Sequence, residues 1–255
     1  MTKRLFGVLF LCGALLFATN LFGSFHGLRS EALKTPISLE TFHQEMQRRT
    51  NESDTEYAKR MTSLVHLGIL HSWDLPKAEA YHVSLPIWEN WIIYALKHFI
   101  PSFEQWEFVD ADKAIERGVG LCSQQSIILS ELLHKNGLDA NILVMDGHVM
   151  VALTQGRHMI LDPDYGVVIE GTLDDARNNL DLVRSKYPSN AVEGIVSIYA
   201  KPHVAMVSGV EQYHPRRFWL EPLLYAMKWL LPLLLMVPRV LLRDQRVIRG
   251  QGGIS

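Results

Sequence analysis

Two long apolar segments lie near the ends of the chain. One runs from Leu5 to Phe25 and the other roughly from Leu223 to Leu242, and about twenty apolar residues suffice to cross a bilayer. We predict an N-terminal signal anchor, or transmembrane helix, in residues 1–29. In residues 216–255 we predict a transmembrane or interfacial helix with a basic tail. A cleaved signal peptide is the alternative for the first segment. An interfacial helix is the alternative for the second, because its uninterrupted apolar core is short and contains two prolines.

Basic residues flank the outer ends of both segments. Lys3 and Arg4 precede the first, and the tail of the second carries Arg239, Arg243, Arg246 and Arg249. Positively charged flanks are retained in the cytoplasm. Both termini are therefore predicted to be cytoplasmic at an inner (cell) membrane, with the intervening residues facing the periplasm or the exterior.

The polar and apolar positions of residues 30–111 are typical of helices. Ser38 is a good N-cap for a periodic stretch behind it. Ser53 followed by Glu56 is a capping-box pattern that opens a second helix. A third helix is predicted over residues 86–96, which begin with a proline.

From residue 112 the pattern changes to a helix followed by short apolar runs. A helical turn is stopped by Gly118, and a longer helix begins near Cys122 and ends at Asn136–Gly137. Turn dipeptides then separate four strand-like runs: 140–145, 149–153, 158–161 and 167–169. Helices followed by neighbouring strands predict an α+β core over residues 112–215, with an antiparallel meander.

Net charge and cysteine count argue against two classes of protein, those that bind nucleic acid and those held together by disulfides. The 255 residues carry a net charge of −2 with both signs mixed, so the basic footprint of a nucleic-acid-binding protein is missing. The two cysteines are Cys12 and Cys122, and Cys12 lies in the first apolar segment. No intradomain disulfide framework is possible, and Cys122 would be a lone thiol in an oxidising compartment.

Cys122 is the candidate nucleophile. It lies where a glycine-rich turn, residues 118–121, becomes a helix. A helix N-terminus lowers a thiol pKa and offers amides to an oxyanion. The thiolate needs a base, and the base needs an orienting carboxylate. His148, in an apolar strand-like run, and Asp162, at the end of the next run, fit these two roles.

Other interpretations of the same residues remain. Asp146 lies two positions before His148 and Asp164 two positions after Asp162, so each is a rival orienting group on the same strand face. Taken alone, a cysteine is usually a small buried hydrophobe. The remaining histidines show no close ligand spacing with Cys122. We therefore expect no metal and no cofactor.

The candidate residues and their surroundings resemble the core of the transglutaminase-like superfamily. The resemblance covers roughly residues 112–168 and is carried by Arg-Gly-Val-Gly-Leu-Cys-Ser-Gln-Gln at 117–125, Gly-His-Val at 147–149 and Ile-Leu-Asp-Pro at 160–163. It implies a papain-like α+β fold in which the cysteine helix packs on an antiparallel sheet. It also implies Cys122 as nucleophile, His148 as base and Asp162 as its orienting partner.

Two features depart from the family pattern. Val149–Met150 stand where an aromatic residue often follows the family's histidine, and the stretch between cysteine and histidine is short. Both indicate a trimmed or specialised substrate cleft. The side chain that completes the oxyanion hole stays open among Gln105, Trp106 and Gln124.

These observations predict a membrane-anchored thiol hydrolase or acyltransferase acting on an amide through a Cys122 thioester. Peptide cleavage, as by a cysteine protease, is favoured because no amine-binding site for transamidation is evident. The partner would be a protein or peptide substrate rather than nucleic acid. The alternative is a non-catalytic module that assists an envelope or polysaccharide assembly system through a membrane-protein partner, and an unrelated cysteine enzyme is a third possibility. The oligomeric state is not indicated.

Overall fold

The chain forms two compact units. The computed structural model describes residues 2–72 and 75–251, with side chains described for residues 4–72 and 77–239. One unit comprises residues 1–28, 84–106 and 219–255, and the other comprises residues 29–83 and 107–218. Residues 84–106, which the sequence places in a helical part running from 30 to 111, group with the two apolar helices.

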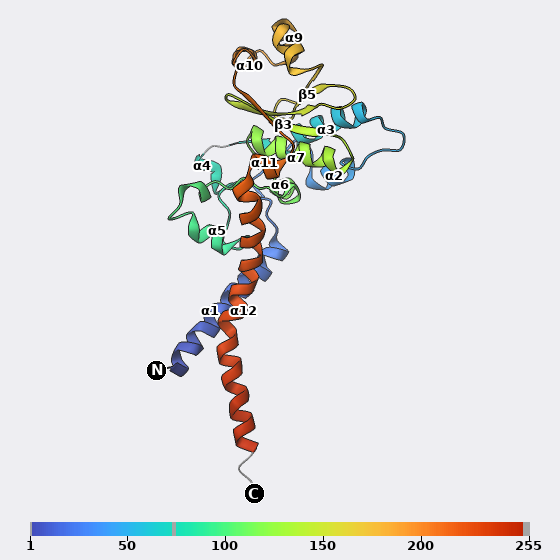
Figure 1. Cartoon of the computed structure of the whole chain (residues 1–255). Helices are drawn as coiled ribbons and strands as arrows, with labels where there is room; N and C mark the ends of the chain where they lie inside the picture. Colours follow the sequence, from blue (N-terminus) through green and yellow to red (C-terminus); the bar gives the residue numbers. More distant parts are fainter. Residues whose placement is uncertain (1, 73–74, 252–255) are drawn as a thin grey trace. The chain divides into compact units, whose positions relative to one another are not determined.

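A five-stranded antiparallel sheet lies in the second unit (Figure 1). Its strands, in spatial order, are β6 (Val167–Glu170), β5 (Met159–Asp162), β4 (His148–Leu153), β3 (Ala140–Met145) and β7 (Val204–Val207). The first four form the meander that the sequence predicts, and β7 pairs with the free edge of β3. The mixed class with an antiparallel sheet is thus confirmed.

Helices cover both faces of this sheet (Figure 1). On one face, α8 (Leu173–Asn178), α9 (Leu180–Lys186) and α10 (Val192–Tyr199) form a buried cluster with the strands. On the other face, α7 (Cys122–Lys135) packs on β3 and β4, and α3 (Asp54–Gly68) packs on α7. Two hydroxyls of α7 fix it to the sheet, because Ser126 and Ser130 donate to the carbonyl oxygens of Val149 and Ala140.

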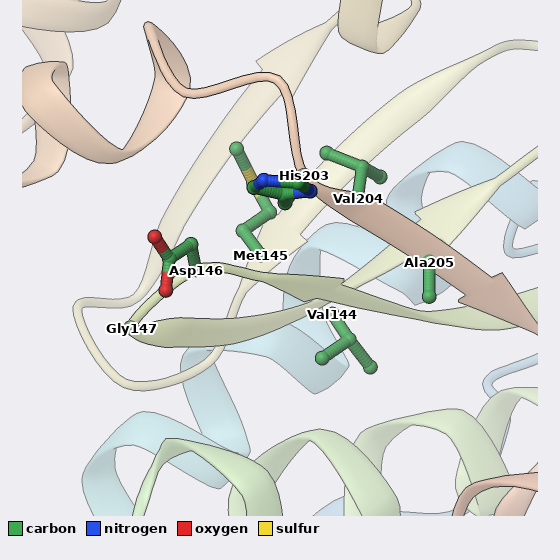
Figure 2. A pocket seen from close by; sticks show the side chains of 7 residues that line it. All are labelled: Val144, Met145, Asp146, Gly147, His203, Val204 and Ala205. Atoms are coloured by element: carbon green, nitrogen blue, oxygen red, sulfur yellow. The ribbon is translucent and has the colours of Figure 1, made fainter.

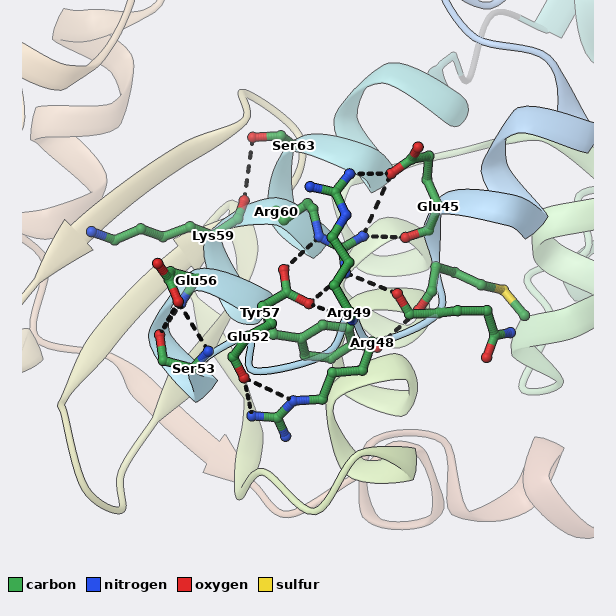
Figure 3. Close-up of polar contacts among 12 residues, drawn as sticks. Glu45, Arg48, Arg49, Glu52, Ser53, Glu56, Tyr57, Lys59, Arg60 and Ser63 are labelled. Atoms are coloured by element: carbon green, nitrogen blue, oxygen red, sulfur yellow. Dashed lines mark hydrogen bonds and ion pairs between the residues drawn. The ribbon is translucent and has the colours of Figure 1, made fainter.

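The helix starts follow the predicted caps. Ser38 accepts a hydrogen bond from the Thr41 amide at the start of α2 (Leu39–Glu45), and Ser53 and Glu56 form a complete capping box at the start of α3. Arg60 of α3 binds Glu52 with 2.6 Å between Nε and Oε1 (Figure 3). This hydrogen bond lowers the pKa of Glu52 to about 2 and ties the α2–α3 connection to α3.

The first unit contains the two apolar helices. They are α1 (Thr2–His26) and α12 (Pro215–Gln251), whose last part, from residue 219, belongs to this unit. Arg4–His26 and Pro215–Arg239 are long and apolar enough to cross a membrane. The side chains of Lys3, Arg243, Arg246 and Arg249 lie outside the described residues, so the orientation drawn from them stays a prediction.

The two apolar helices contact each other along their length. The rings of Phe17 and Trp229 meet edge to face with 5.5 Å between centroids. A Cβ on Gly13 would lie 2.6 Å from the carbonyl oxygen of Pro232, so the backbones are too close there for a larger residue. The Asn20 amide donates to the Lys228 carbonyl oxygen at 2.6 Å. Close packing around glycine and a polar cross-link are the usual means by which helices associate in lipid.

The segment between Ser84 and Trp106 includes α5 (Trp91–Leu96) and a 3₁₀ turn at Pro101–Phe103. The predicted helix over residues 86–96 is wrong at its start. Asn90 is an extended residue whose side chain accepts hydrogen bonds from the amides of Ile92 and Ile93, and it begins the helix five residues later than the proline suggests.

The described part of the second unit has five further short elements. They are β1 (Leu70–His71), α4 (Leu75–Ala78), α6 (Ala111–Arg117), β2 (Val119–Gly120) and α11 (Val210–Tyr213). β1 and β2 pair in parallel. Gly118, at φ 76°, ends α6 in the left-handed conformation that glycine adopts at least cost.

A buried amide holds the start of α7. The Gln124 side-chain oxygen accepts hydrogen bonds from the Phe108 amide at 2.7 Å and from Arg117 Nη2 at 3.0 Å. Its Nε2 donates to the Phe108 carbonyl oxygen at 2.8 Å. Gln124 and Arg117 are both fully buried, so these bonds satisfy groups that water cannot reach.

Replacing this amide should destabilise the protein strongly. Gln124→Leu removes the acceptor of the buried Phe108 amide and one acceptor of Arg117, at a cost of about 3 kcal/mol in the free energy of unfolding. Chemical denaturation of the detergent-solubilised full chain measures it. Gln44→Leu, on the exposed side of α2, is the control, and equal midpoints for the two variants would contradict the structural role of Gln124.

Candidate active site

Cys122 is the first residue of α7, as the sequence predicts. No side chain caps this helix, so no N-cap side chain occupies the amides of its first turn. Gly120 precedes it closely, and a Cβ there would lie 2.5 Å from the Gln124 Cβ. Glycine is therefore required for the turn to lead directly into α7. The thiol is half-buried and reduced.

His148 and Asp162 meet on one face of the sheet. The register pairs Val151 with Leu161, which sets His148 diagonally across from Asp162, and diagonal neighbours in antiparallel strands can reach each other when one side chain is long. The distance from His148 Nε2 to Asp162 Oδ2 is 2.8 Å. Both residues are buried, with 5% and 0% of their surfaces exposed.

Cys122 contributes to the raised pKa of the same imidazole. Burial disfavours the charged ring, but hydrogen bonds to Asp162 and to Cys122, together with their charges, outweigh burial and raise the pKa of His148 to about 10. Nε2 is bonded to Asp162, which leaves Nδ1 as the second hydrogen-bonding atom of the ring. The structure thus brings the three predicted residues together in the order thiol, imidazole, carboxylate.

Asp162 has two further donors. The Tyr187 hydroxyl donates to the same Oδ2 at 2.9 Å, and the Asp164 amide donates to Oδ1 at 3.0 Å. Burial and the nearby carboxylate raise the pKa of Tyr187 well above its usual range, so the phenol keeps its proton. The Tyr165 ring lies between, with its centroid 5.9 Å from that of His148 and 5.5 Å from that of Tyr187.

The rival carboxylates are engaged elsewhere. Asp146 pairs with Lys201 at 3.2 Å and is largely exposed. Asp164 pairs with His71, with 2.5 Å between Oδ1 and Nδ1. Of the three candidate carboxylates, Asp162 is the one that holds His148.

The three candidates for the oxyanion hole differ in whether their side chains already have hydrogen-bond partners. The side-chain amide of Gln124 is hydrogen-bonded to Phe108 and Arg117. Trp106 Nε1 donates to Glu221 at 3.0 Å. Gln105 Nε2 is buried without a hydrogen-bond partner among the described residues. Gln105 and Trp106 belong to the unit of the apolar helices, and a role for either stays a prediction.

A second polar cluster adjoins the nucleophile and was missed from the sequence. Ser123, the residue after Cys122, donates to Glu107, and the other carboxylate oxygen lies 2.6 Å from His214 Nε2. Burial raises the pKa of Glu107, but these two hydrogen bonds together with the charges of His214 and Arg217 outweigh burial and lower it. Tyr213 packs in the same apolar cluster as Cys122, and burial raises its pKa to about 12.

Glu107 and His214 stand far apart in the sequence, and neither lies in a recognisable motif. No sequence signal identified them. Tyr187 was equally hidden, because it follows a short helix that the apolar pattern did not mark.

A surface depression of about 540 Å³ lies away from these groups. It is lined by the β3–β4 turn and by the start of β7, and the lining residues are Val144, Met145, Asp146, Gly147, His203, Val204 and Ala205 (Figure 2). None of the three candidate catalytic residues lines it. Within the described part of the chain, no three histidine, cysteine, aspartate or glutamate side chains gather as a metal-binding group.

Comparisons with protein-family models, with curated proteins and with solved structures find no match to this chain. The site is therefore interpreted from its own geometry.

The raised pKa of His148 makes stability depend on pH. The contribution is complete below pH 6.5, the ordinary histidine pKa, and is lost as the pH rises toward 10. The free energy of unfolding of the wild type should therefore fall more steeply over this interval than that of His148→Gln. Chemical denaturation across the interval measures both slopes, and parallel curves would show that His148 titrates near its ordinary pKa.

Removing the Tyr187 hydroxyl should lower the free energy of unfolding more than removing an ordinary buried hydroxyl does. Tyr187→Phe removes a hydrogen bond to a buried carboxylate, at a cost of about 2 kcal/mol, whereas a bond between neutral groups contributes about 1 kcal/mol. Tyr57→Phe is the control with neutral partners only, since its hydroxyl faces the carbonyl oxygens of Met46 and Leu132 at 3.2 and 3.4 Å and accepts from Asn136 Nδ2 at 2.7 Å. Equal losses in denaturation at pH 7 would argue against a charged acceptor.

Proposed function

We propose that the chain is a membrane-anchored thiol hydrolase or acyltransferase that attacks an amide bond. The observation that carries the proposal is the linear arrangement of a helix-start thiol, a buried imidazole and a buried carboxylate. An imidazole of raised pKa stabilises the thiolate beside it as an ion pair. The proposed nucleophile is the thiolate, because the thiolate and not the thiol attacks a carbonyl.

Each residue has a definite step in the proposed reaction. The Cys122 thiolate adds to the amide carbonyl, and first-turn amides of α7 stabilise the oxyanion. The protonated His148 gives its proton to the leaving nitrogen as the C–N bond breaks, which leaves a thioester. His148 then takes a proton from water as the water attacks the thioester, and acid and thiolate are restored. Asp162 keeps the ring oriented throughout.

The proposed reaction is peptide cleavage. Water alone resolves the thioester in this version, whereas transamidation needs a site for an amine. A transglutaminase-like core is part of the same proposal, and its support is the cysteine helix packed on an antiparallel sheet with histidine and aspartate on adjacent strands. The resemblance of the motifs at Cys122, His148 and Asp162 points the same way.

The proposed location is the cell membrane, with both termini in the cytoplasm and the thiol outside. Two helices of sufficient length and apolarity support the anchoring, and the basic residues at both ends of the sequence support the orientation. The substrate would then be an exported or membrane-bound protein or peptide.

A non-catalytic docking module is the second candidate. Cys122 is only half-exposed, and the depression of Figure 2 lies at the β3–β4 turn rather than at the thiol. In this version a membrane-protein partner of an envelope or polysaccharide assembly system would bind the domain, and the buried polar groups would serve the fold alone.

Thiol reactivity separates the two candidates. In a Cys12→Ser background, iodoacetamide should label Cys122 near pH 7 at least tenfold faster than it labels glutathione, because the raised pKa of His148 places a positive charge beside the thiol. His148→Ala should abolish the difference, while His158→Ala, a strand-edge histidine outside the site, should keep it. Mass spectrometry of the labelled peptide gives the rates. Slow labelling of all three proteins would refute the enzyme and favour the docking module.

A further inference from the structure

The segment from Ser84 to Trp106 is bound to the apolar helices by polar and aromatic contacts. The Trp88 ring lies 6.1 Å from the Phe22 ring and 5.2 Å from the His26 ring. A Cβ on Gly23 would lie 2.1 Å from the Trp88 carbonyl oxygen, so the two backbones touch. The segment therefore meets α1 in its last two turns.

The same segment meets α12 around Lys228. The Lys228 ammonium donates to the Glu89 carbonyl oxygen at 2.6 Å, and the Tyr225 hydroxyl donates to the Glu89 carboxylate at 2.6 Å. The Trp91 indole donates to the Lys228 carbonyl oxygen at 3.3 Å. Lys228 of α12 and Glu89 of the segment are 7% and 4% exposed, so both charged groups are buried where the segment meets the helix.

Helix length sets the depth of these contacts. The apolar part of α1 runs from Leu5 to Phe25, which is about 31 Å at 1.5 Å per residue. The hydrocarbon core of a bilayer is about 30 Å thick. If α1 spans, its whole apolar length is immersed, and residues 22–26 lie at the boundary between hydrocarbon and headgroups. The segment that touches them lies at the same depth.

The exposed surface of the segment fits that depth. Phe99 is 82% exposed, Ile87 44% and Ile100 40%. Trp88, Trp91 and Tyr94 belong to the same segment, and such aromatic residues are enriched at the edge of a bilayer. Irregular backbone is tolerated at this depth where its polar groups are satisfied, as the Asn90 side chain satisfies the amides of Ile92 and Ile93 here.

We infer that residues 84–106 form a membrane-interface element whose exposed Phe99, Ile87 and Ile100 side chains enter the lipid. The partner of this surface is the acyl-chain boundary of the bilayer. The inference rests on the proposed spanning of α1, because the length of that helix fixes the depth. It does not depend on the chemistry of Cys122.

Spin labels test the depth of the segment. Single cysteines replace Phe99, Leu11 or Glu193 in a Cys12→Ser, Cys122→Ser background, and each full-length protein is labelled and reconstituted into phosphatidylcholine–phosphatidylglycerol vesicles. Leu11 is exposed on α1 and reports spanning, whereas Glu193 is exposed on α10 and reports water. Power-saturation spectroscopy compares collisions with oxygen, which concentrates in lipid, and with a nickel chelate, which stays in water.

The expected result is an oxygen-to-nickel ratio at Phe99 at least fivefold above that at Glu193 and below that at Leu11. Ile87→Cys should repeat it and guards against a local effect of the Phe99 substitution. A label at Phe99 as accessible to nickel as the one at Glu193, with Leu11 in lipid, overturns the inference and leaves the anchor intact. Water at both Leu11 and Phe99 overturns both, and lipid at Phe99 with water at Leu11 refutes the span and with it the depth assigned to the segment.

Discussion

The buried carboxylate of Asp162 is the group on which the arrangement of the candidate site depends. A charge shielded from water is costly unless donors surround it, and here the donors come from three places: His148 on β4, Tyr187 after α9, and the Asp164 amide of its own turn. Satisfying this charge fixes the relative positions of the β4 strand, the β5–β6 turn and the α8–α10 helices. The orientation of the imidazole follows from the same requirement.

The other side of the site is fixed by the start of α7. Gly118 turns the chain, Gly120 allows the close approach, and the amide of Gln124 holds Phe108 and Arg117 in place. Glu107 accepts a hydrogen bond from Ser123, the residue after Cys122. Contacts on both sides of Cys122 therefore fix where α7 begins relative to the sheet that carries His148.

Much of this could be predicted from the sequence where the signal is local. Ser53 and Glu56 form the expected capping box, Gly118 ends α6, and the turn signals give the four meander strands. Cys122, His148 and Asp162 were found because each stands at the end of a recognisable helix or strand. Their meeting is a structural finding, while their catalytic roles remain proposals.

What escaped prediction depends on contacts between distant residues. β7 is a short edge strand whose pairing with β3 has no local mark, and α5 begins at Trp91 because Asn90 caps it. Tyr187 belongs to the site through its hydrogen bond to Asp162, and His214 through its hydrogen bond to Glu107. Both bonds join residues that are distant in the sequence. A choice among Asp146, Asp162 and Asp164 needed the strand register, which sequence spacing alone does not give.

The placement of β7 also has a consequence for the order of folding. Met145 pairs with Val204, so roughly sixty residues must close into a loop before this edge forms, whereas the meander closes through short turns. Tyr187 lies within that loop. The thiol, imidazole and carboxylate come from residues 122–162 and can therefore come together before the sheet is complete. Until β7 docks, the edge of β3 stays unpaired, and an unpaired edge is a template for pairing with another chain.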